Sequence, residues 1–395
     1  MPTPCARTRP NPPNVQSEPR KPKAALILTG GGARAAYQIG VLKAVRELMV
    51  LPEENPFPIL CGTSAGAINA ATLAVFADDF DAAVSNLLEV WENMRAHHVY
   101  RSDVLGSART AAHWLSAMML VSRRSPTSML DNRPLAQVLS RTLDFARVQE
   151  NIDSGHLYAV SITCSGYTSG QSVSFYQGGP DARAWERTQR VGVAMPLRVE
   201  HLMASAALPF IFPAVRINRE YFGDGTMRQI APISPALHLG ADRVLVVSTG
   251  RQAAEVPRVH ARTYPSLAQV AGHALNSIFL DSLYADIERL QRINRTISLI
   301  PAETRSNRGL PLRTVKVLVI SPSQPIERIA LRFVGELPWT VRFLLRGVGA
   351  MNRSGSTLAS YLLFERGYCG ALIDLGYRDT LERRNEVLEF LDTAH

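Results

Sequence analysis

Short apolar runs and longer helical stripes alternate along the first part of this chain. The run from Ala24 to Leu28 is apolar throughout and is followed closely by glycine, which is typical of a buried strand. From Arg34 to Met49, apolar residues recur at helical spacing. The same order repeats around Ser64, with a short apolar run before it and an alanine-rich helical stretch after it. Strand, glycine turn and helix in this alternation predict an α/β fold with parallel strands.

Further patterns extend this prediction toward the C-terminus. Strands are expected at 157–165, 171–177 and 243–250, and residues 80–148 are expected to be largely helical. The pattern changes near residue 250: residues 267–295 predict one long amphipathic helix, a strand is possible at 315–323, and residues from Ile326 onward are expected to be helical. We therefore expect a main domain over 24–250 and a mostly helical region over 251–395, packed on that domain or facing a membrane. The strand near 316 could still join the same sheet.

Composition agrees with a folded chain, because 46% of its 395 residues are hydrophobic. The first 23 residues are rich in proline and arginine and predict a disordered leader. Five of the cations that make up the net charge of +9 lie there (Arg7, Arg9, Arg20, Lys21 and Lys23). The modest positive charge that remains suits an anionic membrane or an acidic ligand as well as simple solvation. No basic cluster is interleaved with aromatic residues, so we expect no nucleic-acid partner.

The spacing of the cysteines and the lack of long apolar runs bear on where in the cell the protein is expected. The four cysteines are far apart and form no C-x-x-C pair, which argues against a metal site or a disulfide framework and favours a reducing compartment. The leader has no apolar core of a signal peptide, and no apolar run reaches the roughly 18 residues of a membrane span. The expected location is therefore cytoplasmic or peripheral to a membrane.

The stretch CGTSAGAINAA places Ser64 at the predicted turn from strand to helix. Gly62 and Gly66 leave the space that a sharp turn requires, and Thr63 and Ala65 complete the G-x-S-x-G pattern. A helix that starts here would direct its positive end at a developing oxyanion. The same glycines would also serve a turn with no chemistry, so this stretch alone leaves both interpretations open.

The glycine run upstream has two interpretations of its own. Gly30, Gly31 and Gly32 follow the first strand, where a G-x-G-x-x-G loop would bind a dinucleotide. Here Ala35 occupies the third glycine position, and the acidic residue that such a site needs would fall in a proline-rich loop. The alternative is an oxyanion hole made of backbone N–H groups beside the serine turn. Two glycine turns at neighbouring strand ends favour acyl transfer over nucleotide binding.

A base for the serine is less obvious. The histidines show no partner pattern, and too few strands precede Ser64 for the Ser–Asp–His order of an α/β-hydrolase. Asp224 lies between two glycines, which by itself most often marks a tight turn. As a base it would need a desolvated site and direct contact with the serine hydroxyl.

Taken together, four motifs resemble the patatin-like phospholipase family over about residues 24–250: GGGARAAYQIGVL, GTSAGAINA, ASAALPFIFPAV, and DGT followed by PISPAL. The resemblance implies a three-layer α/β fold with a mostly parallel central sheet and a Ser–Asp dyad that needs no metal or other cofactor. It makes Ser64 the nucleophile and Asp224 the proton acceptor. It also assigns the oxyanion loop to Gly30, Gly31, Gly32 and Arg34.

The implied activity is hydrolysis of an acyl ester of phospholipid or another lipid through an acyl-enzyme. An acyltransferase or thioesterase with the same serine turn, or a lipid-binding module without activity, remains an alternative. Two residues depart from the family pattern: Ala35 would stiffen the oxyanion loop, and Thr226 after Gly225 would narrow the site or tilt Asp224. The basic, aromatic segments 331–349 and 113–124 are candidate membrane-facing surfaces, or else pack on the main domain.

Overall fold

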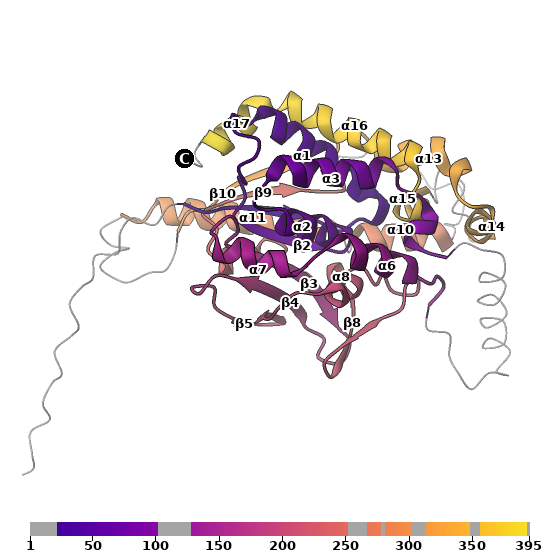
Figure 1. Ribbon diagram of the computed structural model, residues 1–395, viewed down its shortest axis with the longest axis horizontal. Helices are drawn as coiled ribbons and strands as arrows, with labels where there is room; N and C mark the ends of the chain where they lie inside the picture. Colours follow the sequence, from indigo (N-terminus) through magenta and orange to yellow (C-terminus); the bar gives the residue numbers. More distant parts are fainter. Residues whose placement is uncertain are drawn as a thin grey trace, which may run out of the picture.

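One mixed β-sheet organises the molecule (Figure 1). The computed structural model describes residues 22–101, 128–251, 267–277, 281–301, 313–347 and 356–392. The strands are β1 (Ala24–Leu28), β2 (Ile59–Thr63), β3 (Ala159–Gly166), β4 (Ser172–Gly178), β5 (Trp185–Arg187), β6 (Arg190–Ala194), β7 (Val215–Ile217), β8 (Glu220–Asp224), β9 (Arg243–Val247) and β10 (Lys316–Ile320). Their order is β10-β9-β1-β2-β3-β4-β6-β5, with β8 also paired to β3 and β7 paired to β8.

The centre of the sheet is parallel, as the sequence predicts. Strands β10, β9, β1, β2 and β3 all run in the same direction, and the first antiparallel partner is β4. Strands β1, β2 and β9 are buried along their whole length. Continuous apolar strands of this kind require helices on both faces of the sheet.

The helices supply both outer layers. They are α1 (Ala36–Leu48), α2 (Ala65–Val75), α3 (Phe80–Glu92), α4 (Ala96–Val99), α6 (Arg133–Thr142), α7 (Ala146–Asp153), α8 (Val199–Ser205), α9 (Ser234–His238), α10 (Leu267–Asn276), α11 (Ser282–Ser298), α13 (Ile326–Phe333), α14 (Trp339–Gly347), α15 (Ser356–Leu362), α16 (Arg366–Glu382) and α17 (Arg384–Asp392), with short 3₁₀ turns η1 (Gly32–Ala35), η2 (Gly225–Arg228) and η4 (Val334–Glu336). One core lies between the sheet and α1, α2, α3 and α16. A second core lies on the opposite face, under α9 and α11. The fold is therefore the expected three-layer α/β arrangement with helices at the C-terminus.

The C-terminal region is packed directly on the first helix. Helices α1 and α16 lie together over one face of the sheet (Figure 1). They approach closely because a side chain at Gly40 or Gly376 would collide with the backbone of the other helix. The Tyr37 hydroxyl donates to Asp379 Oδ2 at 2.9 Å across this interface. In addition, β10 pairs with β9, so residues on both sides of position 250 build one sheet.

Strand β8 is the element that the hydrophobic pattern did not predict and that matters most for the site. It pairs antiparallel with β3, and the register places Asp224 opposite Cys164. The adjacent residue of β3, Thr163, is the partner of Thr63 in β2. Asp224 is therefore brought to the end of β2, where Ser64 follows.

Several expectations concern residues outside the described ranges. The leader up to residue 21 and the segment 113–124 lie outside them. The long helix expected at 267–295 corresponds to α10 and α11, between which residues 278–280 are not described. Within the described part of the chain, every helix is too short or too polar to cross a bilayer.

Candidate active site

Ser64 occupies a strained turn between β2 and α2. Its backbone has φ 56° and ψ −130°, a left-handed φ that residues other than glycine rarely adopt. A side chain at Gly62 would collide with the backbone of Gly66 and Ala67, and one at Gly66 would collide with the carbonyl groups at the end of β1. The turn is thus held tightly on both sides, which explains why glycines flank the serine.

The hydroxyl of Ser64 contacts the carboxylate of Asp224 directly. Ser64 Oγ donates to Asp224 Oδ2 at 2.6 Å, and both side chains are buried. The other carboxylate oxygen, Oδ1, accepts from the Thr226 N–H at 3.0 Å and from its hydroxyl at 2.6 Å. Thr226 therefore orients the carboxylate so that Oδ2 faces the serine. In this structure the residue that departs from the family pattern supports Asp224.

The environment of Asp224 favours proton acceptance. Its carboxylate is removed from solvent entirely, and this burial raises its pKa above the ordinary value of 3.8. The hydrogen bonds from Ser64 and Thr226 stabilise the charged form and oppose part of that rise. A carboxylate with a raised pKa is a stronger base than an exposed aspartate, which is what abstraction of a serine proton requires.

Ser205 is a site residue that sequence analysis missed. Its hydroxyl accepts from the Ser64 backbone N–H at 2.8 Å and donates to the Thr163 carbonyl at 2.6 Å. It thereby connects the serine turn to the strand beside Asp224. Gly225 approaches the same carbonyl of Thr163 so closely that a side chain there would collide with it. Ser205 lies in the ASAALPFIFP stretch, whose similarity to the family was the only signal for it.

The glycine loop lies beside the serine turn and has free donors. Gly32 has φ 55°, which explains a glycine at that position. Among the described residues, the structure records no acceptor for the backbone N–H groups of Gly31 and Gly32. The Thr249 hydroxyl donates to the Gly30 carbonyl and fixes the start of the loop. Ala35 has φ −65°, so alanine in place of glycine adds no strain there.

The donors of Arg34 are directed elsewhere. Its backbone N–H donates to the Gly31 carbonyl at 3.1 Å, and its guanidinium donates to Ser360 at 2.8 Å and to Asn276 at 3.1 Å. The side chain is only 2% exposed. Arg34 therefore holds the loop to the C-terminal helices α10 and α15, while the free N–H groups belong to the glycines.

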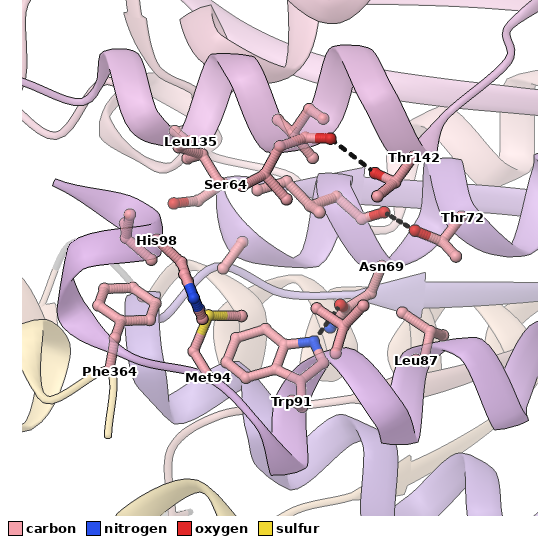
Figure 2. Close-up of a pocket in the computed structure, with 18 of the residues that line it drawn as sticks. Ser64, Asn69, Thr72, Leu87, Trp91, Met94, His98, Leu135, Thr142 and Phe364 are labelled. Atoms are coloured by element: carbon pink, nitrogen blue, oxygen red, sulfur yellow. Dashed lines mark hydrogen bonds between the residues drawn. The ribbon is translucent and has the colours of Figure 1, made fainter. Parts of the chain in front are cut away.

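An apolar cavity of about 510 Å³ opens at Ser64. One face of α2 lines it with Ser64, Ile68, Thr72 and Phe76, which are four residues apart and so lie above one another on a helix. Figure 2 shows Ser64 at one end of the cavity and Thr72 toward the other. The remaining walls come mainly from α3, α4, α6, the segment 206–212 and α15, with Gly32 and Asp224 near Ser64, and they are mainly apolar. The cavity thus offers a mainly apolar surface that follows one face of α2 from Ser64 to Phe76.

A chain of buried polar side chains supports the floor of the cavity. The indole N–H of Trp91 donates to Asn69 at 2.9 Å, as Figure 2 shows, and Asn69 donates to Gln38 at 2.8 Å. Gln38 in turn donates to the Thr29 carbonyl at 2.8 Å, just before the glycine loop. These bonds satisfy polar groups that would otherwise be costly to bury. Within the described ranges, no three metal-ligating side chains come together.

Comparison with known proteins places this geometry in a family. The model of the patatin-like phospholipase family matches residues 26–237, which contain Ser64, Asp224 and the glycine loop. The chain is similar to a cGAMP-activated phospholipase of Pseudomonas aeruginosa, with 26% identity over 54% of this chain and 55% of that protein. It is also similar to a triacylglycerol lipase of Schizosaccharomyces pombe, with 27% identity over 48% of this chain and 33% of that protein.

Among solved structures, human GIVD cytosolic phospholipase A2 is similar at 12% identity and a TM-score of 0.47. That match covers 95% of this chain and 60% of the human chain. In each of these three comparisons, the chain spans less than two thirds of the relative's own length.

Proposed function

Because the chain belongs to the patatin-like phospholipase family, whose model matches more than half of it, we propose that it is a phospholipase A or lysophospholipase that uses a Ser64–Asp224 dyad. The observation that carries this proposal is the 2.6 Å hydrogen bond between Ser64 Oγ and Asp224 Oδ2 at the head of an apolar cavity. A hydrolase of lipid acyl esters needs both parts, a nucleophile with its base and an apolar site for the acyl chain.

In the proposed reaction, Ser64 Oγ attacks the ester carbonyl carbon while Asp224 Oδ2 accepts the hydroxyl proton. The N–H groups of Gly31 and Gly32, with the N-terminus of α2, stabilise the negative charge on the carbonyl oxygen. The tetrahedral intermediate collapses when the ester C–O bond breaks and the leaving alcohol takes the proton from Asp224. Water then gives a proton to Asp224 and its oxygen attacks the acyl carbon of the acyl-enzyme. The bond between the acyl carbon and Ser64 Oγ breaks, Oγ takes the proton back from Asp224, and the fatty acid is released.

The acyl chain of the substrate is assigned to the part of the cavity that runs along α2 from Ser64 to Phe76, which we call the groove. From Ser64 to Phe76 the helix advances roughly 18 Å, at 1.5 Å per residue. An extended aliphatic chain advances roughly 1.2 Å per bond, as an extended peptide backbone does. The groove therefore has room for an acyl chain of about 15 carbons in contact with the wall of α2. A long-chain lipid ester fits this length better than a short one.

Access to such a lipid requires contact with its bilayer, and α14 is the proposed contact. Trp339 and Phe343 are 58% and 76% exposed, one helical turn apart, while Val341 and Leu345 are buried against the protein. Arg346 is exposed on the same helix and would attract anionic headgroups. In Figure 1, α14 lies at the same end of the molecule as α10 and α15, and α15 contributes to the cavity wall. We propose a location at the membrane surface.

Fluorophosphonate labelling and fatty-acid release from phosphatidylglycerol vesicles test this function. The wild-type protein is expected to label and to release fatty acid, whereas Ser64→Ala neither labels nor hydrolyses and Asp224→Asn hydrolyses at a residual rate. Equal release by all three proteins would refute the dyad. Labelling of the wild type without phospholipid hydrolysis would refute the lipase assignment and favour a short-ester or thioester substrate.

A separate measurement tests the membrane surface. Co-sedimentation with the same vesicles is expected to decrease when Trp339 and Phe343 are both replaced by serine. Hydrolysis of a soluble short-chain ester should stay unchanged in that variant, because Trp339 and Phe343 do not line the cavity at Ser64. Unchanged co-sedimentation would exclude α14 as the contact.

A further inference from the structure

The guanidinium of Arg34 is buried in a set of partners that come from outside the matched family region. Nε donates to Ser360 Oγ at 2.8 Å, one terminal nitrogen donates to Asn276 Oδ1 at 3.1 Å, and the other donates to the Thr357 carbonyl at 3.3 Å. The ring of Tyr361 lies against the guanidinium at 4.0 Å. These partners belong to α10 and α15, and the hydrogen-bond partners follow Arg34 by 242 to 326 residues.

The partners of Arg34 are all neutral. No carboxylate of the described residues lies within ion-pair distance of it. Burying a cation without a counter-charge is expensive, and here hydrogen bonds and the aromatic face supply the compensation. The partners also orient one another, because Tyr361 donates to Asn276 at 3.1 Å and Ser360 donates to Thr357 at 2.6 Å. Loss of one member therefore disturbs the others.

Helix α15 also contacts the backbone of the oxyanion loop directly. A side chain at Gly32 would collide with the Tyr361 carbonyl, so the loop backbone lies in contact with the backbone of α15. Tyr361 also lines the cavity together with Ser64 and Asp224. One residue of α15 thus contacts Arg34, the glycine loop and the substrate cavity.

We propose that Arg34 is a positioning residue that fixes the oxyanion loop to α10 and α15, so that the C-terminal helices complete the active site. This inference rests on the proposed hydrolase function. The N–H groups of Gly31 and Gly32 stabilise the oxyanion only when they lie at hydrogen-bond distance from it. Release of Arg34 from Asn276 and Ser360 lets the loop move away from Ser64. A misplacement of about 1 Å at such a site lowers the rate roughly 10²-fold.

The kinetic signature of this role is a loss in kcat with little change in KM. Loop donors act on the tetrahedral transition state, whereas the proposed acyl-chain contacts are with the wall of α2, which also contributes in the ground state. Arg34→Met is expected to lower kcat by about 30- to 100-fold. Asn276→Ala and Ser360→Ala are each expected to lower it by about 3- to 10-fold, since each removes one hydrogen bond to the guanidinium. Arg34→Lys is expected to lose less activity than Arg34→Met, because lysine keeps the positive charge but lacks the planar guanidinium with its several N–H donors.

Two matched variants control for general damage to the fold. Arg243 is also buried, 4% exposed, and stacks on Phe390 at 5.6 Å at the start of β9, far from the loop. Asn294 on α11 makes two hydrogen bonds to the backbone of Val315, at 2.8 and 3.1 Å. Arg243→Met and Asn294→Ala should leave kcat unchanged within about twofold. If Arg34→Met does not fold, the comparison of Asn276→Ala with Asn294→Ala decides the question.

Hydrogen exchange of the peptide that contains residues 29–36 gives a readout without turnover. Exchange is expected to accelerate in Asn276→Ala and Ser360→Ala and to stay at the wild-type rate in Asn294→Ala. Unchanged kcat and unchanged exchange in Asn276→Ala and Ser360→Ala would overturn the proposal. Losses of the same size in Arg243→Met and Asn294→Ala would also overturn it. If the wild type hydrolyses no ester, the proposed function fails. The hydrogen-exchange comparison then tests by itself whether Arg34 and its partners hold the loop in place.

Discussion

The two halves of the candidate site are held in different ways. The dyad half, Ser64 with Asp224, is built from strand ends that pair in one sheet, and its supporting residues Ser205 and Thr226 lie within the matched family region. The loop half, around Gly32, is braced by α10 and α15 from the other end of the chain. The proposed nucleophile and base therefore depend on sheet pairing, whereas the proposed oxyanion donors depend on helices that the family match does not include.

This difference separates two kinds of failure. Damage to the dyad removes the reacting atoms and leaves the loop in place. Damage to the bracing helices is expected to leave Ser64 and Asp224 in contact but to displace the proposed oxyanion donors. The four predictions below test the two halves separately, in order of decreasing effect.

Replacement of Asp224 by asparagine attacks the dyad half and has the largest expected effect. Ester hydrolysis should fall by about 10³-fold or more, because the amide is no base for the serine proton. The folded state of this variant, by contrast, should be more stable than that of the wild type at neutral pH. The raised pKa means that the folded state holds this proton more tightly than the unfolded state, so ionisation destabilises the folded wild type as pH rises above the ordinary value of 3.8.

The difference in melting temperature, Asp224→Asn minus wild type, is thus expected to increase as pH rises from 3 to 7. A difference that does not vary with pH would contradict a raised pKa. In the wild type, kcat/KM should decrease on acidification with a midpoint above 3.8, because only the ionised carboxylate accepts the proton.

Gly32→Ala attacks the loop half. The substitution requires a left-handed φ in alanine and a collision with the Tyr361 carbonyl, so the loop must shift. We expect kcat to fall by roughly 10²-fold. Gly370→Ala in α16 is the control, since nothing lies within 4 Å of its added methyl group and alanine favours a helix. Retained activity in Gly32→Ala would show that the position of the loop does not affect the rate of hydrolysis.

The groove belongs to the dyad half, because it runs along the helix that starts after Ser64. Thr72→Phe would fill it about 12 Å from the nucleophile, eight residues along α2. Hydrolysis of a palmitoyl ester is expected to fall about tenfold, whereas a butyryl ester should be unaffected within about twofold, since its chain ends before Thr72. Thr296→Phe on the exposed face of α11 serves as the control. Equal losses on both esters would place the acyl chain elsewhere.

Thr226→Val makes the smallest expected change, within the dyad half alone. It removes the 2.6 Å bond from the Thr226 hydroxyl to Asp224 and keeps the N–H bond. The acidic limb of kcat/KM should move upward in pH, because a hydrogen bond that lowers the pKa of Asp224 is lost. Thr226→Ser should behave like the wild type. A downward shift would mean that Thr226 does not stabilise the charged form.

Much of the fold was predictable because its signals are local. The buried run Ala24–Leu28, the glycine-flanked Ser64 and the helical stripe after it appear in the structure as β1, the strained turn and α2. The three-layer α/β class followed from their alternation. Short strands β5 to β8 carry little hydrophobic pattern, so the same reasoning did not find them. The pairing of β8 with β3, which positions Asp224, joins segments far apart in the sequence and leaves no local signal.

The sequence by itself determined which residues have the chemistry of a nucleophile and a base, since a serine between glycines and an aspartate in a D-G pair carry their reactive atoms wherever they lie. Only the tertiary structure decided that Ser64 and Asp224 meet at 2.6 Å, because that contact depends on the register of β8 with β3. It also decided the role of Arg34. Nothing near this arginine in the sequence indicates that its partners are Asn276 and Ser360, since long-range hydrogen bonds between helices leave no periodic or local signal.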